Sequence, residues 1–380
     1  MKLLHLILID KEMDKMKVFF EPIKNNENAY IKNIITALKN NGIEFYNEDI
    51  NSKIFKAWNY LKALLKKEKI IFHFNWVENI TEKKGFKFKV IEKLYLVFVC
   101  IAHIFGKKVV WTMHNTISHH CDDIKRTEKF LKNWIKLMDL IIVHCNESKA
   151  YLINKYNYDE KQICVVPHGK YNTNEINNNK LKELKDKYGI HNEIVYMYFG
   201  KLDNYKNIPL LINVFEKLNL KNAKLLICGS FAKGVSNDVR LWIENHNYES
   251  NIILDNRFIP EEEISILLKI ADVLVLPYDR TSMQNSGAAI LAISNGVPFI
   301  IPEFGYISDI KEFSFVHTYS YQDEKEHFKN LSYEILKFYS NFDRNILNEI
   351  SEKEKNFAKI NLDWNAISKK IIIRYKKLFN

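Results

Sequence analysis

The segment 271–302 most constrains what this chain can fold into. It reads ADVLVLPYDRTSMQNSGAAILAISNGVPFIIP, and residues 273–276 form a continuous apolar run, as in a strand that helices cover on both faces. A polar loop follows, and then Ser286 and Gly287 open a helix whose free N–H groups and dipole favour phosphate oxygens. The segment therefore predicts a parallel sheet with an anion site at a helix N-terminus. An ordinary strand-to-helix crossover with a tight turn would use the same residues.

Apolar runs alternate with helical patterns along the rest of the chain. In the first half we expect strands at 3–9, 70–74, 109–113 and 140–144, and the alternation restarts at residue 194. A length of 380 residues is too long for one comfortable core. We therefore predict an α/β fold with two Rossmann-like, doubly wound parallel-sheet domains facing a cleft.

The expected domain boundaries follow from composition. Residues 1–169 form the first domain, and an Asn-rich stretch at 170–192 is the interdomain linker because it offers little apolar surface. Residues 193–355 form the second domain, with polar helices after Glu303. Residues 356–380 form a C-terminal helix that Asp363 caps and that packs back toward the first domain.

Charge and cysteine content narrow the class of partner and compartment. The formal net charge is +10, which suits a nucleotide or an anionic phospholipid surface, and the scattered lysines show no nucleic-acid-binding motif. Five cysteines, odd in number and without a CxxC pair, indicate a reducing compartment. The apolar start at 3–9 ends at Asp10 without a cleavage-type site, which favours a first strand over a signal peptide. We expect a cytoplasmic protein.

A second long apolar stretch, 94–102, lies between lysine-rich flanks and is too short and interrupted to span a bilayer. Two interpretations stay open. A buried domain helix is favoured by the general rule that such runs belong to cores. The alternative is an element that rests on an anionic membrane surface, which would make the protein peripheral at the inner face of the plasma membrane.

Short motifs in both halves, taken in order and spacing, resemble the GT-B glycosyltransferases over nearly the whole chain. The closest similarity is to the family-four-like enzymes that extend bacterial surface glycans and glycolipids. The motifs are His73-Phe74-Asn75-Trp76, Trp111-Thr112-Met113-His114-Asn115, Val166-Pro167-His168-Gly169, Gly200-Lys201-Leu202, Tyr205-Lys206-Asn207, Ile227-Cys228-Gly229-Ser230, Phe258-Ile259-Pro260, Pro277-Tyr278, Ser286-Gly287 and Gly296-Val297-Pro298.

The resemblance implies transfer of a hexosyl group from a nucleotide diphosphate sugar to a glycan or lipid-linked oligosaccharide in cell-surface polysaccharide assembly. It implies neither a catalytic metal nor a cofactor. Positive groups must stabilise the departing diphosphate, and Lys201 and Lys206 are the candidates, although both could be solvated surface lysines. The residues expected to bind the donor are Lys201, Lys206, Arg257, Phe258, Ile259, Tyr278, Ser286 and Gly287, with residues 257–259 acting through their backbone.

His114 is expected to contact the donor sugar or the acceptor, and His168 is a weaker candidate. Met283 and Leu291 stand where many retaining members carry two glutamates, so the stereochemical outcome stays open. An inverting enzyme would need a carboxylate base, for which Glu78 and Asp122 or Asp123 are candidates. A retaining enzyme could use the diphosphate itself. The crowded run His119, His120, Cys121, Asp122 and Asp123 has poor geometry for a metal site.

Three functions therefore remain in competition. The first is a transferase, and the second is a nucleotide-sugar epimerase or sugar phosphorylase of the same architecture, which would act without the acceptor. The third is a catalytically silent subunit that binds a nucleotide sugar and supports a partner. All three predict donor binding, and only the transferase predicts acceptor-dependent release of nucleotide.

Overall fold

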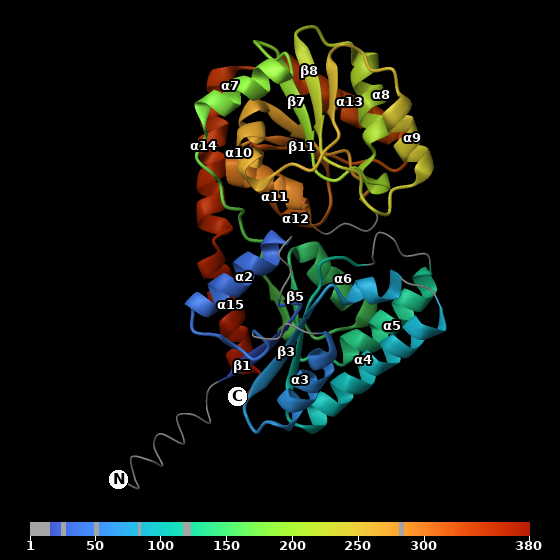
Figure 1. The fold of residues 1–380 in the computed structure, drawn as a ribbon, viewed down its shortest axis with the longest axis vertical. Coiled ribbons are helices and arrows are strands. Elements are labelled where there is room, and N and C mark those ends of the chain that lie inside the picture. The colour runs from blue at the N-terminus through green and yellow to red at the C-terminus, as the bar shows by residue number, and fades with distance from the viewer. Residues whose placement is uncertain (1–15, 24–27, 49–52, 83–84, 117–122, 281–284) are drawn as a thin grey trace. The chain divides into compact units, whose positions relative to one another are not determined.

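The computed structural model describes residues 16–23, 28–48, 53–82, 85–116, 123–280 and 285–380 (Figure 1). The chain divides into two compact units, one made of Met1–Gly169 and Leu362–Asn380 and the other of Lys170–Asn361. The strand expected at 3–9 lies outside the described residues. Within the described part of the chain, no helix is long and apolar enough to cross a membrane.

The described residues of the first unit form a six-stranded parallel sheet in the order β2-β1-β3-β4-β5-β6. Its strands are β1 (Lys17–Glu21), β2 (Glu44–Phe45), β3 (Ile70–Asn75), β4 (Lys108–Thr112), β5 (Leu140–Val143) and β6 (Ile163–Val165). Apolar side chains fill both faces because strand residues alternate: Phe19, Phe72 and Trp111 enter one core, and Phe20, Ile71 and Val110 enter the other.

Helices cover both faces of this sheet, as Figure 1 shows. On one side lie α3 (Lys53–Leu65), α4 (Phe86–Ile104), α5 (Ile124–Lys136) and α6 (Asn146–Tyr156), and on the other lie α2 (Ala29–Asn40) and α15 (Trp364–Lys377). The cap predicted for the last helix is present, since the Asp363 carboxylate accepts a hydrogen bond from the Ala366 N–H at 2.9 Å. Ile371 and Tyr375 of α15 are buried in the core of the first unit.

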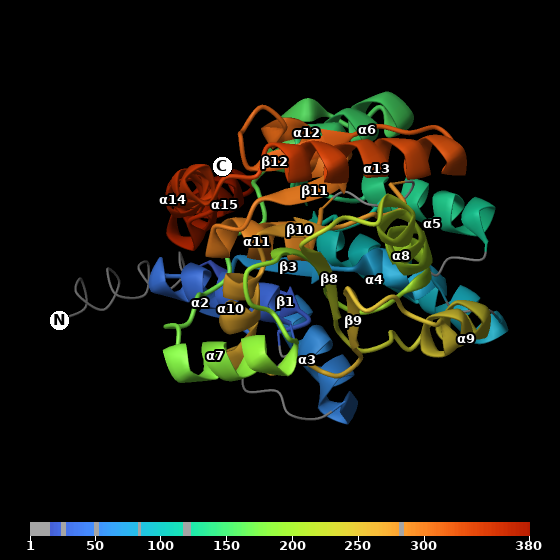
Figure 2. The same ribbon diagram turned by 90° about the horizontal axis from the view of Figure 1, so that it is seen from above.

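The second unit repeats this plan with a parallel sheet in the order β12-β11-β10-β7-β8-β9. On one side of it lie the helices α8 (Ile208–Leu218), α9 (Asn237–Asn245) and α13 (Glu324–Ser340), and on the other lie α7 (Asn178–Lys187), α10 (Glu261–Ile270), α11 (Gly287–Asn295) and α14 (Arg344–Asn361) (Figures 1 and 2). The strands are β7 (Ile194–Phe199), β8 (Ala223–Cys228), β9 (Ile252–Asp255), β10 (Val273–Val275), β11 (Phe299–Pro302) and β12 (Val316–Tyr319). The short helix α12 (Gly305–Ile310) joins the last two.

Two segments differ from what the sequence pattern predicts. The stretch after Glu303, expected to hold only polar helices, contains β12, which is short and carries two polar residues between its buried ends. Within the stretch 170–192, expected to be a linker, α7 packs against α10 as part of the second unit. Its pattern is weak because Leu184 is its one buried residue.

The connection order places particular loops where ligands bind. β7 and β10 are neighbours, and from them the chain runs to β8 on one side and to β11 on the other. In open parallel sheets, ligands bind outside the carboxyl ends of the strands where the connection order reverses. The loops after β7 and β10 emerge at this point, and they carry Lys206 and Ser286.

Glycines allow two of these loop backbones to approach closely. Gly229, after β8, has φ of +145°, and a Cβ added there would lie 1.9 Å from the carbonyl oxygen of Gly200, after β7. Backbone atoms cannot move aside as a flexible side chain can. The motif glycines therefore hold the loops after β7 and β8 together.

We expect Gly229→Ala to destabilise the second unit by about 3 kcal/mol, because a clash with backbone adds to an unfavourable φ. Urea unfolding measures the loss. The matched control is Gly42→Ala, which also has positive φ (+86°) but no atom within 4 Å of the added Cβ. If the two substitutions cost the same, the close approach of Gly200 and Gly229 does not constrain the fold.

Candidate active site

The loops after β7 and β10 are joined in the second unit. The Asp279 N–H donates a 2.7 Å hydrogen bond to the Tyr205 carbonyl oxygen. The rings of Tyr205 and Tyr278 lie with their centroids 6.2 Å apart. These contacts fix the position of the short 3₁₀ helix η3 (Asn204–Lys206) against the loop that follows β10.

Lys206 lies between these two rings. Its Nζ is 3.4 Å from the ring centroid of Tyr278 and 4.7 Å from that of Tyr205. Part of the side chain reaches solvent, but the rings enclose the ammonium, and this burial lowers the pKa of Lys206 to about 7, with the charge of Asp203 acting in the opposite direction. Among the described residues no carboxylate forms an ion pair with it. The Lys206 ammonium is therefore placed to bind an anionic ligand.

Ser286 is the N-cap of α11, and its side chain lies next to the Tyr278 phenol. Its hydroxyl oxygen accepts a 3.1 Å hydrogen bond from the Ala289 N–H, and the residue is buried. Burial raises the pKa of the Tyr278 phenol far above its usual range, and the adjacent Ser286 hydroxyl acts in the opposite direction. Gly287, the first residue of the helix, is exposed. Lys206, Tyr278 and Ser286 thus form one continuous group, which we call the lysine–serine site.

The other residues expected to bind the donor are arranged differently. Lys201 is exposed, and its carbonyl oxygen accepts a 2.7 Å hydrogen bond from the Tyr198 hydroxyl. The Arg257 guanidinium forms ion pairs with Asp255 at 2.9 Å and with Glu263 at 2.6 Å, so its charge is already neutralised. Phe258 is 77% exposed and Ile259 is buried. Arg257 therefore fixes its own loop, whereas the Lys206 ammonium belongs to the lysine–serine site.

In the first unit, four histidines gather at the carboxyl ends of β3 to β6, three of them buried and His114 half-buried. They are His73, His114, His144 and His168, which belong to or follow four consecutive strands of the sheet. Tyr30 of α2 lies among them, with its ring centroid 4.9 Å from His114, 5.7 Å from His144 and 5.1 Å from His168. We call this group the histidine cluster. The sequence analysis named His114 and His168 but not His144, although all three stand at or soon after a strand end.

His114 is held on three sides. Its Nε2 lies 3.2 Å from the Asn75 Oδ1 and its Nδ1 lies 3.3 Å from the His144 Nε2. Its ring stacks on Trp76, with centroids 4.2 Å apart. Burial, and then the neighbouring histidines, hold the pKa of His114 well below its usual value. The imidazole is therefore neutral at physiological pH and can act as a hydrogen-bonding group rather than as a cation.

Glu78 does not fit the role of a general base. It is fully buried in the 3₁₀ helix η1 (Val77–Glu82), and its Oε1 accepts a 3.2 Å hydrogen bond from the Asn115 N–H. Burial raises its pKa to about 8, so most of the carboxyl groups are protonated at pH 7. Glu78 instead ties η1 to the loop that carries His114.

Several candidates lie outside the described residues, namely Asp122, Met283 and the run His119, His120 and Cys121. Asp123 caps α5, since its carboxylate accepts a 3.0 Å hydrogen bond from the Arg126 N–H. Leu291, the other position where a glutamate was sought, is half-buried on α11. Across the ranges that the structure describes, no group of three His, Cys, Asp or Glu side chains is arranged to hold a metal ion.

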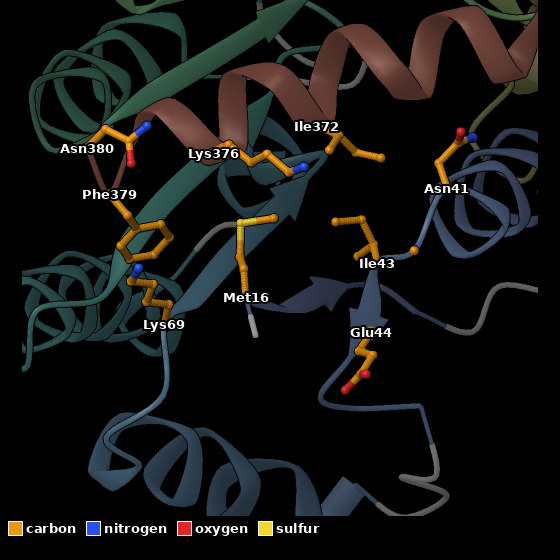
Figure 3. A pocket seen from close by; sticks show the side chains of 10 residues that line it. Met16, Asn41, Ile43, Glu44, Lys69, Ile372, Lys376, Phe379 and Asn380 are labelled. Carbon is orange, nitrogen blue, oxygen red and sulfur yellow. The ribbon is translucent and has the colours of Figure 1, made fainter. Parts of the chain in front are cut away.

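A pocket of about 410 Å³ also lies in the first unit, at the amino ends of β1 to β3 (Figure 3). Met16, Ile43 and Ile372 line it together with Lys69 and Lys376. The histidine cluster lies at the opposite edge of the same sheet, where parallel sheets bind their ligands. We therefore place the candidate site of this unit at the cluster.

Two doubly wound parallel-sheet units, each with polar groups at its carboxyl edge, are the architecture of the GT-B glycosyltransferases. Two family models match the chain, one on each unit. Residues 35–169 match "Glycosyltransferase Family 4" and residues 181–313 match "Glycosyl transferases group 1". The chain belongs to the family-four-like GT-B glycosyltransferases.

Solved structures share the fold over almost the whole chain. A glycosyltransferase from Rickettsia africae matches with a TM-score of 0.67 and 15% identity, covering 96% of this chain and 98% of that one. HepE from Anabaena, in complex with UDP and glucose, matches with a TM-score of 0.65 and 15% identity, covering 96% and 99%. Sucrose-phosphate synthase from Thermosynechococcus elongatus has a TM-score of 0.67, 15% identity and coverage of 96% and 98%. No curated protein matches the sequence.

Proposed function

We propose that this glycosyltransferase moves a hexosyl group from a nucleotide diphosphate sugar to a glycan or lipid-linked oligosaccharide at the inner face of the plasma membrane, in cell-surface polysaccharide assembly. The lysine–serine site carries the proposal, because it offers a helix N-terminus and an ammonium that pairs with no carboxylate of the described residues, both at the reversal point of the second sheet. The HepE structure with UDP and glucose supports a nucleotide-sugar donor.

The chemistry follows from charge. As the bond between the sugar and the diphosphate breaks, negative charge grows on the leaving phosphate oxygens. The Lys206 ammonium and the free N–H groups at the start of α11 stabilise that charge without a metal ion. Because an anion favours the charged form of lysine, donor binding raises the pKa of Lys206 from about 7.

The histidine cluster is the proposed contact for the sugar or the acceptor. The neutral His114 imidazole is oriented by Asn75, His144 and Trp76, and it can hydrogen-bond a sugar hydroxyl by exchanging its Nε2 contact with Asn75 for that hydroxyl. Since Glu78 is protonated at pH 7, the proton of the acceptor hydroxyl would pass to the departing diphosphate or to a base from elsewhere in the chain.

We expect His114→Ala to lower kcat by about a hundredfold, the lower range for a positioned catalytic group, and to leave the donor Kd nearly unchanged. Nucleotide release is measured with a panel of nucleotide sugars, with and without membrane extract as the source of acceptor. His191→Ala, at an exposed histidine of the second unit, is the control.

The same assay separates the competing functions. Release of nucleotide or rearrangement of donor without acceptor would indicate an epimerase or phosphorylase. Donor binding by calorimetry without turnover, even with extract, would indicate a silent binding subunit. An equal loss of donor binding and turnover in His114→Ala would contradict the role given to His114.

A further inference from the structure

An apolar stripe runs along the outer side of α4. Its residues recur every three or four positions, which places them on a single face of the helix. They are Phe86 (83% exposed), Val90 (38%), Leu94 (59%), Val97 (52%), Ile101 (37%) and Ile104 (81%). The opposite side of α4 packs into the core through Val99 and Ala102. The helix favoured from sequence as a buried one is therefore buried on one side only.

Helix α3 extends the apolar surface. Its exposed residues are Trp58 (53%), Leu61 (45%) and Leu65 (61%), again at helical spacing. The two helices cover the same face of the first sheet (Figure 1), and the rings of Tyr60 and Phe98 join them with centroids 5.0 Å apart. Apolar patches this extensive on a protein surface mark contact with a protein or a membrane.

The charges on these helices select the partner. Their sequences contain six lysines (Lys53, Lys56, Lys62, Lys87, Lys89 and Lys93) and one acidic residue, Glu92. Glu92 is buried and forms an ion pair with Arg126, at 2.5 Å. Lys62, Lys89 and Lys93 are exposed. The surface thus combines apolar side chains with positive charge, which complements an anionic bilayer.

A second copy of the chain is a poorer occupant. In a two-fold interface the same patch meets itself, so Lys62, Lys89 and Lys93 would face the lysines of the other copy, and the one carboxylate in the sequences of these helices, Glu92, is already paired with Arg126. Anionic lipid headgroups offer those negative charges, and the lysine stems can extend beside the apolar stripe toward them.

We propose that the outer faces of α3 and α4 dock on an anionic lipid bilayer, with α4 lying along the interface. This inference deepens the membrane-face location in the proposed function and rests on it for its biological purpose. The docking itself depends only on the surface described above. It would bring the first unit, which carries the histidine cluster, to the bilayer that holds a lipid-linked acceptor.

Vesicle sedimentation of the full chain tests the docking. We expect binding to vesicles that contain phosphatidylglycerol, weak binding to pure phosphatidylcholine vesicles, and a loss of binding at high salt. The variant Val97→Glu/Ile104→Glu should lower partitioning by about tenfold or more, because it places two carboxylates in the stripe. The variant Lys89→Glu/Lys93→Glu should reduce binding to the anionic vesicles, and its surface positions keep the fold intact.

The matched control is Leu241→Glu/Ile360→Glu, two apolar residues of the second unit that are 54% and 64% exposed. It should bind vesicles like the unaltered protein. Equal vesicle binding by the Val97→Glu/Ile104→Glu variant, no binding by the unaltered protein, or a lipid-free dimer that this variant dissociates would each overturn the proposal. Acceptor-dependent release of nucleotide is assayed separately, so a failed transferase assignment would show no such release while vesicle binding persisted.

Discussion

Lys206→Met is expected to weaken donor binding by about a hundredfold or more, the usual cost of removing one partner from an enclosed charge pair. Methionine keeps the apolar contact with Tyr205 and Tyr278 and removes only the ammonium. Calorimetric titration with the nucleotide sugar of the panel that binds the unaltered protein most tightly gives the ratio of Kd values. Lys217→Met is the matched control, because Lys217 also lies over an aromatic ring, that of Phe328, at 5.1 Å. A change of less than about threefold in Lys206→Met would contradict the role of the ammonium.

The pKa of Lys206 adds a dependence on pH with a definite sign. With a pKa of about 7, the free lysine is mainly charged at pH 6 and mainly neutral at pH 8. An anionic donor binds the charged form, so affinity should fall as pH rises above 7, and binding at pH 8 should take up close to one proton. Titrations in buffers of different ionisation enthalpy measure this uptake, which Lys206→Met should abolish.

Acid is expected to unfold the first unit steeply. Burial lowers the pKa of His73 and His168 to about 3 and that of His144 to about 4, and it holds the pKa of His114 well below 6.5. The unfolded chain, with histidine pKa near 6.5, therefore binds more protons, and stability must fall as pH drops below about 6.5. Below this pH, each histidine lowers the free energy of unfolding by up to about 1.4 kcal/mol per pH unit. Four histidines can therefore remove the stability of a typical domain within about two pH units.

Tryptophan fluorescence measures this transition, because five of the six tryptophans, all except Trp242, belong to the first unit. The variant His168→Asn can still donate to the Gly169 carbonyl oxygen, as the His168 Nδ1 does, but cannot take a proton. It should lower the slope of unfolding free energy against pH by about one proton, whereas the exposed His191→Asn should not. Uptake of less than one proton on unfolding of the unaltered protein between pH 5 and 6.5 would contradict this account.

Most of the fold could be predicted from sequence because buried parallel strands are continuous apolar runs. The strands expected near residues 70, 109, 140, 194 and 273 are all present. The pattern failed where burial was slight. β12 is a short edge strand with two adjacent polar residues, and α7 buries a single leucine, so neither carries a strong apolar signal.

The candidate site could be predicted only in part, because side-chain pairing between distant segments leaves no local signal. The motifs pointed to Lys206 and Ser286, but not to the packing of the ammonium on Tyr278. The motifs also could not indicate that Asp255 and Glu263 form ion pairs with Arg257, or that burial keeps Glu78 protonated. The helix at 86–104 was ambiguous for a different reason: apolar composition does not reveal which side of a helix meets the core.

The central claim is that the diphosphate of the donor is held between Lys206 and the start of α11. A crystal structure of the protein with a bound nucleoside diphosphate tests it most directly. The account predicts phosphate oxygens within hydrogen-bonding distance of the Lys206 Nζ and of the Gly287 or Ala288 N–H. A diphosphate bound elsewhere, with Lys206 still packed on Tyr278 and touching no phosphate, would contradict it.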